Sequence, residues 1–73
     1  MNTEQERNLA IRFTYHPPSP EQIPKYNEIR NGAHAYAKLL YELCPKGPEF
    51  ARALNKLDEV VMLANAAIAR DVE

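Results

Sequence analysis

The stretch that decides the fold is residues 48–70, PEFARALNKLDEVVMLANAAIAR. Its apolar residues recur at alternating steps of four and three, which is the spacing of one helix face that packs against a partner helix. Pro48 suits the first turn of a helix, and Glu49 places a negative charge near the positive end of the helix dipole. We therefore expect a helix over residues 48–71. The residues of this face are Phe50, Leu54, Leu57, Val61, Ala64 and Ile68.

The second half of this helix is apolar on every side. Residues 60–69 read VVMLANAAIA, in which Asn65 is the single polar residue. A helix that is apolar all round is normally buried all round. One partner helix covers only one face, so the remaining apolar surface must meet either another subunit or the N-terminal part of the chain.

A second helix is expected over residues 19–44. Ser19 is a suitable N-cap, and Gln22 completes a capping box with it. Pro20 suits the first helical position, although Pro24 can delay the regular helix to that residue. An apolar stripe at helical spacing then follows. Its members are Tyr26, Ile29, Ala33, Tyr36, Ala37, Leu40 and Cys44.

The connection between the two helices is short. Pro45 ends the first of them, and residues 45–47 form the turn. Connections of this length join antiparallel neighbours in helical proteins. The expected unit is therefore an antiparallel helical hairpin.

Residues 1–18 form an arm ahead of the hairpin. Thr3 and Glu6 fit a capping box, which would start a short helix that ends near Arg12. Apolar and polar residues alternate in the second half of this segment, which is the period of a strand. Residues 3–13 can therefore be interpreted as a helix or as a strand, and we favour the helix.

The fold class that follows is all-α, with one domain over residues 1–73. A short N-terminal helix or arm precedes a long antiparallel helical hairpin. Chains below ~70–80 residues rarely bury enough core without disulfides, a metal or self-association. The single cysteine, Cys44, cannot form an internal disulfide, and with two histidines it gives no zinc-ligand spacing. We therefore expect the chain to assemble as a homo-oligomeric helical bundle.

The charge balance excludes some classes of function. Nine Lys and Arg residues oppose ten Asp and Glu residues, which gives a formal net charge of −1. Proteins whose main activity is binding DNA, RNA polymers or anionic membranes usually carry a basic excess. The start, MNTEQERN, is polar and acidic and does not resemble a secretory signal. No apolar run approaches the ~20 residues of a membrane span, so we expect a cytoplasmic protein.

The sequence offers little for catalysis. Cys44 lies on an apolar stripe beside a proline, where a buried small hydrophobic residue is the simpler interpretation. A nucleophile needs a nearby base, and only His16 and His34 are available, neither placed by a motif. We predict no catalytic residues, no metal ligands and no cofactor. An enzyme such as a phosphodiesterase is therefore disfavoured.

Binding chemistry is better represented in the segment TYHPPSP, residues 14–20. Its three prolines make it extended and stiff. Tyr15, His16 and Pro17 form a rigid strip with aromatic faces, on which nucleobases can stack. The alternative is that Tyr15 fills the core of the hairpin.

Further candidates lie on the two long helices. Arg30 falls beside the apolar stripe, where an arginine either extends to solvent or binds an anion through its planar guanidinium. Gly32 costs ~1 kcal/mol in a helix relative to alanine, which is justified where a backbone or a ligand must approach closely. Arg70, with Asn65 a little over one turn before it, is a candidate phosphate ligand at the rim of an oligomer junction. The alternative for Arg70 is a favourable cation at the C-terminal end of a helix.

Several of these segments together resemble a known family. They are FTYHPP at 13–18, then Gln22, Lys25-Tyr26 and Ile29-Arg30, then CPKGPE at 44–49 and ANAAIAR at 64–70. In this order and spacing they resemble the hairpin-domain family of phage anti-defence proteins, the sponges that counter CBASS and Thoeris immunity in bacteria. The resemblance covers about residues 9–70. One departure is Met62-Leu63, where the family pattern leads us to expect a tryptophan.

The resemblance implies a function and an assembly. The family binds cyclic dinucleotides, cyclic trinucleotides or cyclic ADP-ribose isomers without cleaving them, in homo-oligomers that are typically hexamers, with pockets between subunits. Carried over by position, Tyr15 would stack on a base and Arg30 would hold a phosphate in a dinucleotide pocket. Arg70 would serve a trinucleotide pocket.

Two functions follow as expectations. The first is sequestration of cyclic oligonucleotide messengers in the host bacterial cytoplasm, which blocks CBASS or Thoeris defence. The alternative is a helical protein–protein interaction module with no nucleotide ligand. The residues leave the identity of the cyclic nucleotide open, because all three ligand classes present bases and phosphates. The expected ligand-binding residues are Tyr15, His16, Pro17, Arg30, Gly32, Asn65 and Arg70.

Overall fold

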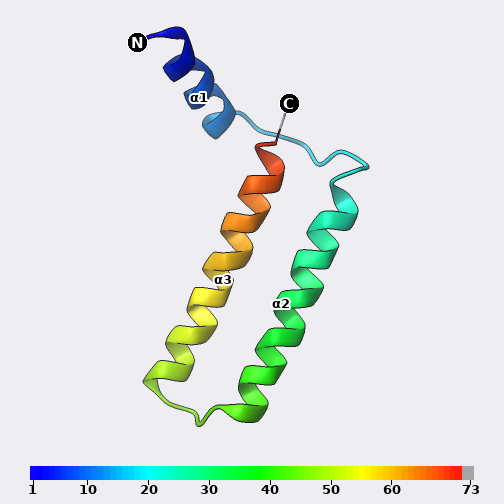
Figure 1. The fold of residues 1–73 in the computed structure, drawn as a ribbon, viewed down its shortest axis with the longest axis vertical. Helices are drawn as coiled ribbons and strands as arrows, with labels where there is room; N and C mark the ends of the chain where they lie inside the picture. The colour runs from blue at the N-terminus through cyan, green and yellow to red at the C-terminus, as the bar shows by residue number, and fades with distance from the viewer. Residues whose placement is uncertain (72–73) are drawn as a thin grey trace.

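The computed structural model describes residues 1–71, and that part of the chain contains three helices and no strand. They are α1 (Thr3–Phe13), α2 (Ile23–Leu43) and α3 (Pro48–Ala69). Figure 1 shows α2 and α3 side by side and antiparallel, with α1 beyond their open end. The all-α hairpin with a short N-terminal helix is therefore confirmed. The last two residues of the predicted domain, 72–73, lie outside the described residues.

The helical interpretation of the arm is correct, but its cap lies one residue earlier than predicted. The Asn2 side chain accepts a hydrogen bond from the Gln5 N–H at 2.8 Å, and the Asn2 N–H donates to Gln5 Oε1 at 3.0 Å. This is a capping box, made by Asn2 and Gln5 instead of Thr3 and Glu6. The reason is that Asn2 has the extended backbone that an N-cap requires, whereas Thr3 is already helical.

The start of α2 also differs from the prediction of a helix over 19–44. Residues 20–22 form a turn, in which Ser19 O accepts hydrogen bonds from the backbone of both Gln22 and Ile23. Pro24 has no N–H to donate, so the link from this turn into the helix is made by the Tyr26 N–H, which donates to Gln22 O at 3.1 Å. The regular helix therefore begins at Ile23.

The end of α3 is two residues earlier than the predicted 48–71. The Arg70 N–H donates to Ala66 O, whereas the Asp71 N–H donates to Ile68 O at 3.2 Å. The second bond spans three residues, which is the tightened last turn common at helix ends. Arg70 is therefore the C-cap of α3, and Asp71 lies outside the helix.

The core of the chain is the seam between α2 and α3. The predicted face of α3, Phe50 to Ile68, is half-buried at every position, and so is the α2 stripe except at Tyr36, which is exposed. None of the residues described by the structure is fully buried. The seam is therefore paired as expected, but the single chain does not enclose it.

The turn end of the hairpin is closed by an aromatic cluster. The rings of Tyr41 and Phe50 meet edge-on, with centroids 4.8 Å apart and planes at 77°. The Lys46 ammonium lies 5.2 Å from the centroid of each ring and donates to Tyr41 O at 3.0 Å. Lys46 therefore caps the C-terminal end of α2 and makes cation–π contacts at the same time.

The molecule is extended for its length. Its Cα radius of gyration is 16.2 Å, whereas a compact 73-residue domain has about 11 Å. Its accessible surface is 6125 Å², against about 4,600 Å² for a compact protein of 8.3 kDa. The excess surface reflects a thin two-helix layer with a projecting arm.

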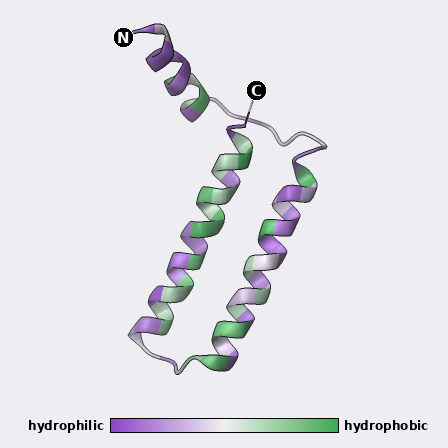
Figure 2. Cartoon of the chain, in the orientation of Figure 1, coloured by the Kyte–Doolittle hydropathy of each residue, from purple (hydrophilic) through white to green (hydrophobic). Residues whose placement is uncertain are grey.

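Apolar side chains account for part of that surface. Val60 and Leu63, about one turn apart, form an exposed strip on α3, and they are exposed to 58% and 71%. Met62, exposed to 67%, lies on another side of the helix. Figure 2 shows the apolar colour concentrated in the C-terminal half of α3. Because α1 packs on neither α2 nor α3 within residues 1–71, the arm does not cover this strip. Of the two predicted partners for the strip, the N-terminal arm is therefore not the one that covers it.

Candidate functional site

The segment between α1 and α2, residues 14–22, forms a strap across the open end of the hairpin (Figure 1). Three prolines restrict its backbone, as the sequence predicts. Two side chains of the strap, His16 and Gln22, hydrogen-bond to the last turns of two helices. The strap therefore connects α1 to the C-terminal end of α3 instead of forming a free linker.

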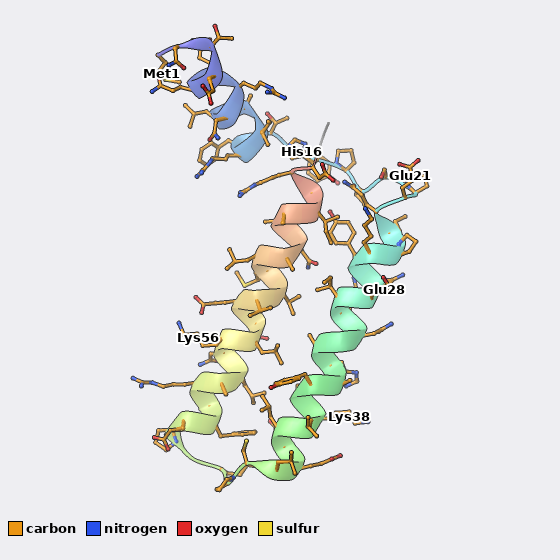
Figure 3. All side chains as sticks on the ribbon, viewed as in Figure 1. Met1, His16, Glu21, Glu28, Lys38 and Lys56 are labelled. Atoms are coloured by element: carbon orange, nitrogen blue, oxygen red, sulfur yellow. The ribbon has the colours of Figure 1, made fainter. Side chains whose placement is uncertain are left out.

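His16 is bound to α1. Its Nε2 lies 2.6 Å from Ile11 O, in the last turn of that helix. A carbonyl oxygen can only accept, so Nε2 carries the proton. Figure 3 shows His16 where the strap passes the end of α3. His16 remains a predicted ligand residue, but this nitrogen is already used within the chain.

Gln22 joins the strap to α3, which sequence reasoning did not anticipate. Its Oε1 accepts from the Ser19 N–H at 3.1 Å, and its Nε2 donates to Ile68 O at 2.9 Å. The first bond is half of the predicted capping box between Ser19 and Gln22. The second joins residues 46 positions apart in the chain. No local pattern could reveal it, although a glutamine between Pro20 and Pro24 is an unusual place for a polar side chain.

A shallow recess lies where the strap meets α3. His16 and Pro17, two of the predicted site residues, line it together with both chain neighbours of Arg70. Two carboxylates, Glu21 and Asp71, also line the recess, and they oppose the binding of a phosphate inside it. A phosphate would be held nearer to Arg70. The lining residues are His16, Pro17, Ser19, Glu21, Gln22, Ala69 and Asp71.

Tyr15 stands on the strap beside this recess. Its side chain is 81% exposed, so it does not fill the core of the hairpin. Phe13, at the end of α1, is equally exposed. An exposed aromatic ring on a stiff backbone is a suitable surface for base stacking.

The predicted residues of α2 do not share one surface. Arg30 and Gly32 are two positions apart, which places them on different sides of a helix. Gly32 lines an open apolar groove, and a methyl group added at its Cα would meet no atom within 4 Å. No other part of the described chain, residues 1–71, therefore approaches Gly32 closely. The groove is lined by Glu28, Ile29, Gly32, Ala33, Tyr36, Leu57, Val60, Val61 and Ala64.

Asn65 and Arg70 lie in the last turns of α3. Asn65 Oδ1 is buried and accepts no hydrogen bond. Leaving a buried acceptor unpaired costs about 1–3 kcal/mol. Arg70 is exposed at the C-cap. The single chain thus brings His16, Pro17 and the end of α3 together, but leaves Arg30 and Gly32 further along α2.

Residues 1–71 hold neither a cluster of metal-binding side chains nor a membrane-spanning helix. Their His, Cys, Asp and Glu side chains nowhere gather in a group of three or more that could hold a metal ion. None of the three helices combines the length and apolar character that a bilayer crossing requires.

The comparison with protein families decides the relationship. The family model described as "Acb2/Tad1, hairpin domain" matches residues 5–69. The chain belongs to this family. The match begins within α1 and includes the strap, both long helices and six of the seven predicted site residues, and Arg70 follows directly after its last residue. No curated protein and no solved structure shows a significant similarity to the chain. The Acb2/Tad1 hairpin is a sponge-type domain and is not known as an enzyme family.

Proposed function

We propose that this chain binds cyclic oligonucleotide immune messengers and holds them without cleaving them. In an infected bacterium this sequestration would block CBASS defence, or Thoeris defence where the messenger is a cyclic ADP-ribose isomer. The observation that carries the proposal is the Acb2/Tad1 hairpin match over residues 5–69. A sponge lowers the free messenger concentration by mass action, so it acts in the cytoplasm, where the messenger is made.

Exposed side chains of the strap and of the two long helices support the proposal. Tyr15 offers an exposed ring on a stiff segment for a base, and Arg30 and Arg70 are exposed guanidinium groups for phosphates. The chain is almost neutral overall, with a formal net charge of −1. Localised arginines on a neutral chain favour a small anion over a nucleic acid polymer.

Self-association is part of the proposal. Nanomolar capture requires about −12 kcal/mol, which is more than one exposed tyrosine and one exposed arginine supply. A pocket closed by two copies could supply it, and the exposed strip and the open groove leave each copy with surface to pair. We propose a homo-oligomer, with a hexamer as the expected state.

The direct test is calorimetric titration of the purified protein with three cyclic probes. These are 3′,3′-cyclic GMP–AMP, cyclic tri-AMP and a cyclic ADP-ribose isomer, and a linear dinucleotide is the control. At least one cyclic probe should bind at nanomolar to micromolar concentration, and the linear control should bind far more weakly. If none of the cyclic probes binds, the proposed function is wrong.

The absence of cleavage is tested on the same complex. After heat denaturation, chromatography should recover the cyclic probe intact. Linear or hydrolysed product would contradict sequestration. Arg30→Glu should abolish dinucleotide binding, whereas Arg52→Glu, an equal charge change on α3 near the turn, should leave it unchanged.

One observation favours a second function. The exposed strip of Val60 and Leu63 could dock another protein, which would make the chain an assembly module with no nucleotide ligand. A thermal-shift screen separates the two functions. The cyclic probes should raise the melting temperature of a sponge, whereas they should leave that of an assembly module unchanged.

A further inference from the structure

The side chain of Gln22 uses both ends of its amide, and this fixes its orientation. The carbonyl oxygen faces a donor, the Ser19 N–H at 3.1 Å, and the amide nitrogen faces an acceptor, Ile68 O at 2.9 Å. Rotating the amide by half a turn would place like partners together, so both bonds would be lost at once. The Gln22 side chain therefore bonds to another residue of the strap and to α3 at the same time.

Ile68 O is a favourable place for this bond. It belongs to the last turn of α3, whose carbonyls have no partners further along the helix. It accepts from the Asp71 N–H at 3.2 Å as well as from Gln22. The donor thus helps to cap α3, two residues before Arg70.

The other side of the strap is bound in a similar way. His16 Nε2 donates to Ile11 O in the last turn of α1, which fixes Tyr15 relative to that helix. Within residues 1–71, α1 packs on neither hairpin helix, so helix packing does not hold the arm in place. The strap is stiff because of its prolines. Without a bond to α3, it would rotate about Ile23 as one rigid segment instead of bending locally.

We propose that Gln22 is a positioning residue, whose bonds to Ser19 N and Ile68 O hold Tyr15 at a fixed place relative to Arg70. The ligand that this geometry serves is the one given by the proposed function, on which the inference rests. When only a fraction of the strap conformations can bind, the apparent Kd rises in inverse proportion to that fraction. Loss of the Gln22 bonds should therefore weaken binding without removing any group that touches the ligand.

Three variants isolate these bonds. Gln22→Met keeps the length of the side chain and removes both bonds. Gln22→Glu keeps the acceptor for Ser19 N but places a carboxylate oxygen against Ile68 O. The control is Asn27→Leu, which removes an exposed amide side chain of α2 outside the recess and makes neither bond.

The first measurement is the position of the arm. Spin labels on Asn8→Cys and Lys56→Cys, in a Cys44→Ala background diluted with unlabelled chain, report the distance between α1 and α3. The distribution should be narrow in the parent and in Asn27→Leu, and clearly broader in Gln22→Met and Gln22→Glu. An equally narrow distribution in both Gln22 variants would overturn the inference. If Gln22→Met lost its helical circular dichroism, Gln22→Glu would decide the result.

The second measurement is calorimetric affinity for 3′,3′-cyclic GMP–AMP. Both Gln22 variants should bind about tenfold more weakly, and the control should bind normally, with the melting temperature of the hairpin unchanged. A broader distance with unchanged affinity would show that Gln22 orders the arm but does not position the site, and the inference would be wrong. If the parent binds no cyclic probe, the proposed function fails, and the label distances alone decide whether Gln22 positions the strap.

Discussion

The two ends of the hairpin are completed in different ways. At the turn end, Tyr41, Phe50 and Lys46 satisfy one another through an edge-on ring pair and two cation–π contacts. At the strap end, the exposed rings of Phe13 and Tyr15 have no such partners, and the arm is held by hydrogen bonds from two side chains. Aromatic side chains at the turn end therefore pack within one chain, whereas those at the strap end stay exposed to solvent.

The largest effect is expected on α3, where apolar side chains are exposed to solvent. Val60→Glu combined with Leu63→Glu should reduce the assembly to single 8.3 kDa chains, because two charges cannot be buried in an apolar contact. Native mass spectrometry and sedimentation measure the change. The free hairpin should keep its helicity, since both side chains are already exposed within it.

The matched control for this prediction is Arg52→Glu, which changes the charge on the same helix nearer the turn. Its mass should equal that of the parent assembly. A double variant that still assembles would remove the strip from the interface. If the parent protein is already a folded single chain at micromolar concentration, no interface between copies is needed for folding.

The next effect concerns the ring on the strap. Tyr15→Ala should weaken binding of 3′,3′-cyclic GMP–AMP by about 1–3 kcal/mol, the usual value of one base stacked on an aromatic side chain. Tyr15→Phe keeps the ring and should bind almost normally. Calorimetry measures both. Equal affinity of the alanine variant and the parent would exclude Tyr15 from the site and leave the strap end without a known ligand contact.

A smaller effect is expected at the closed end. Phe50→Ala removes the ring pair with Tyr41 and part of the seam, and should lower the free energy of unfolding by about 1–3 kcal/mol. It should not change the affinity for a cyclic nucleotide once the protein is folded. Chemical denaturation and calorimetry test the two halves of this prediction. A large loss of affinity would show that the turn end also takes part in the site.

The smallest effect is that of Lys46. Lys46→Met should cost about 0.5–1 kcal/mol through the lost cation–π contacts and the lost cap on Tyr41 O. Lys38→Met, a lysine on α2 that Figure 3 shows pointing outward, is the control and should have little effect. If both variants have the same stability, the cluster owes its stability to the ring pair alone.

Most of the fold could be predicted because the signals are local. Pro48 and Pro45 mark where helices start and stop, and the spacing from Phe50 to Ile68 identifies the face of α3 that pairs with α2. The errors were also local. The cap of α1 lies at Asn2 instead of Thr3. The turn before Ile23 includes residues 20–22, which the sequence predicts as helical, because both Pro20 and Pro24 suit the first turn of a helix.

The site was less predictable, for a physical reason. The bond between Gln22 and Ile68 joins residues far apart in the chain, and neither residue type indicates such a bond. Arg30 and Gly32 are both predicted ligand residues, but a helix turns positions two residues apart to different sides. The single chain does not bring the seven predicted residues to one surface, so their roles stay predictions.

The separation of α1 from the hairpin has a consequence for measured coupling energies. Side chains without shared contacts change stability additively, so substitutions at Phe13 and Leu63 should show no coupling while the chain is alone. A double-mutant cycle that finds coupling in the native particle therefore reports an encounter between different molecules. Measurements of stability can therefore identify which surfaces of different copies are in contact.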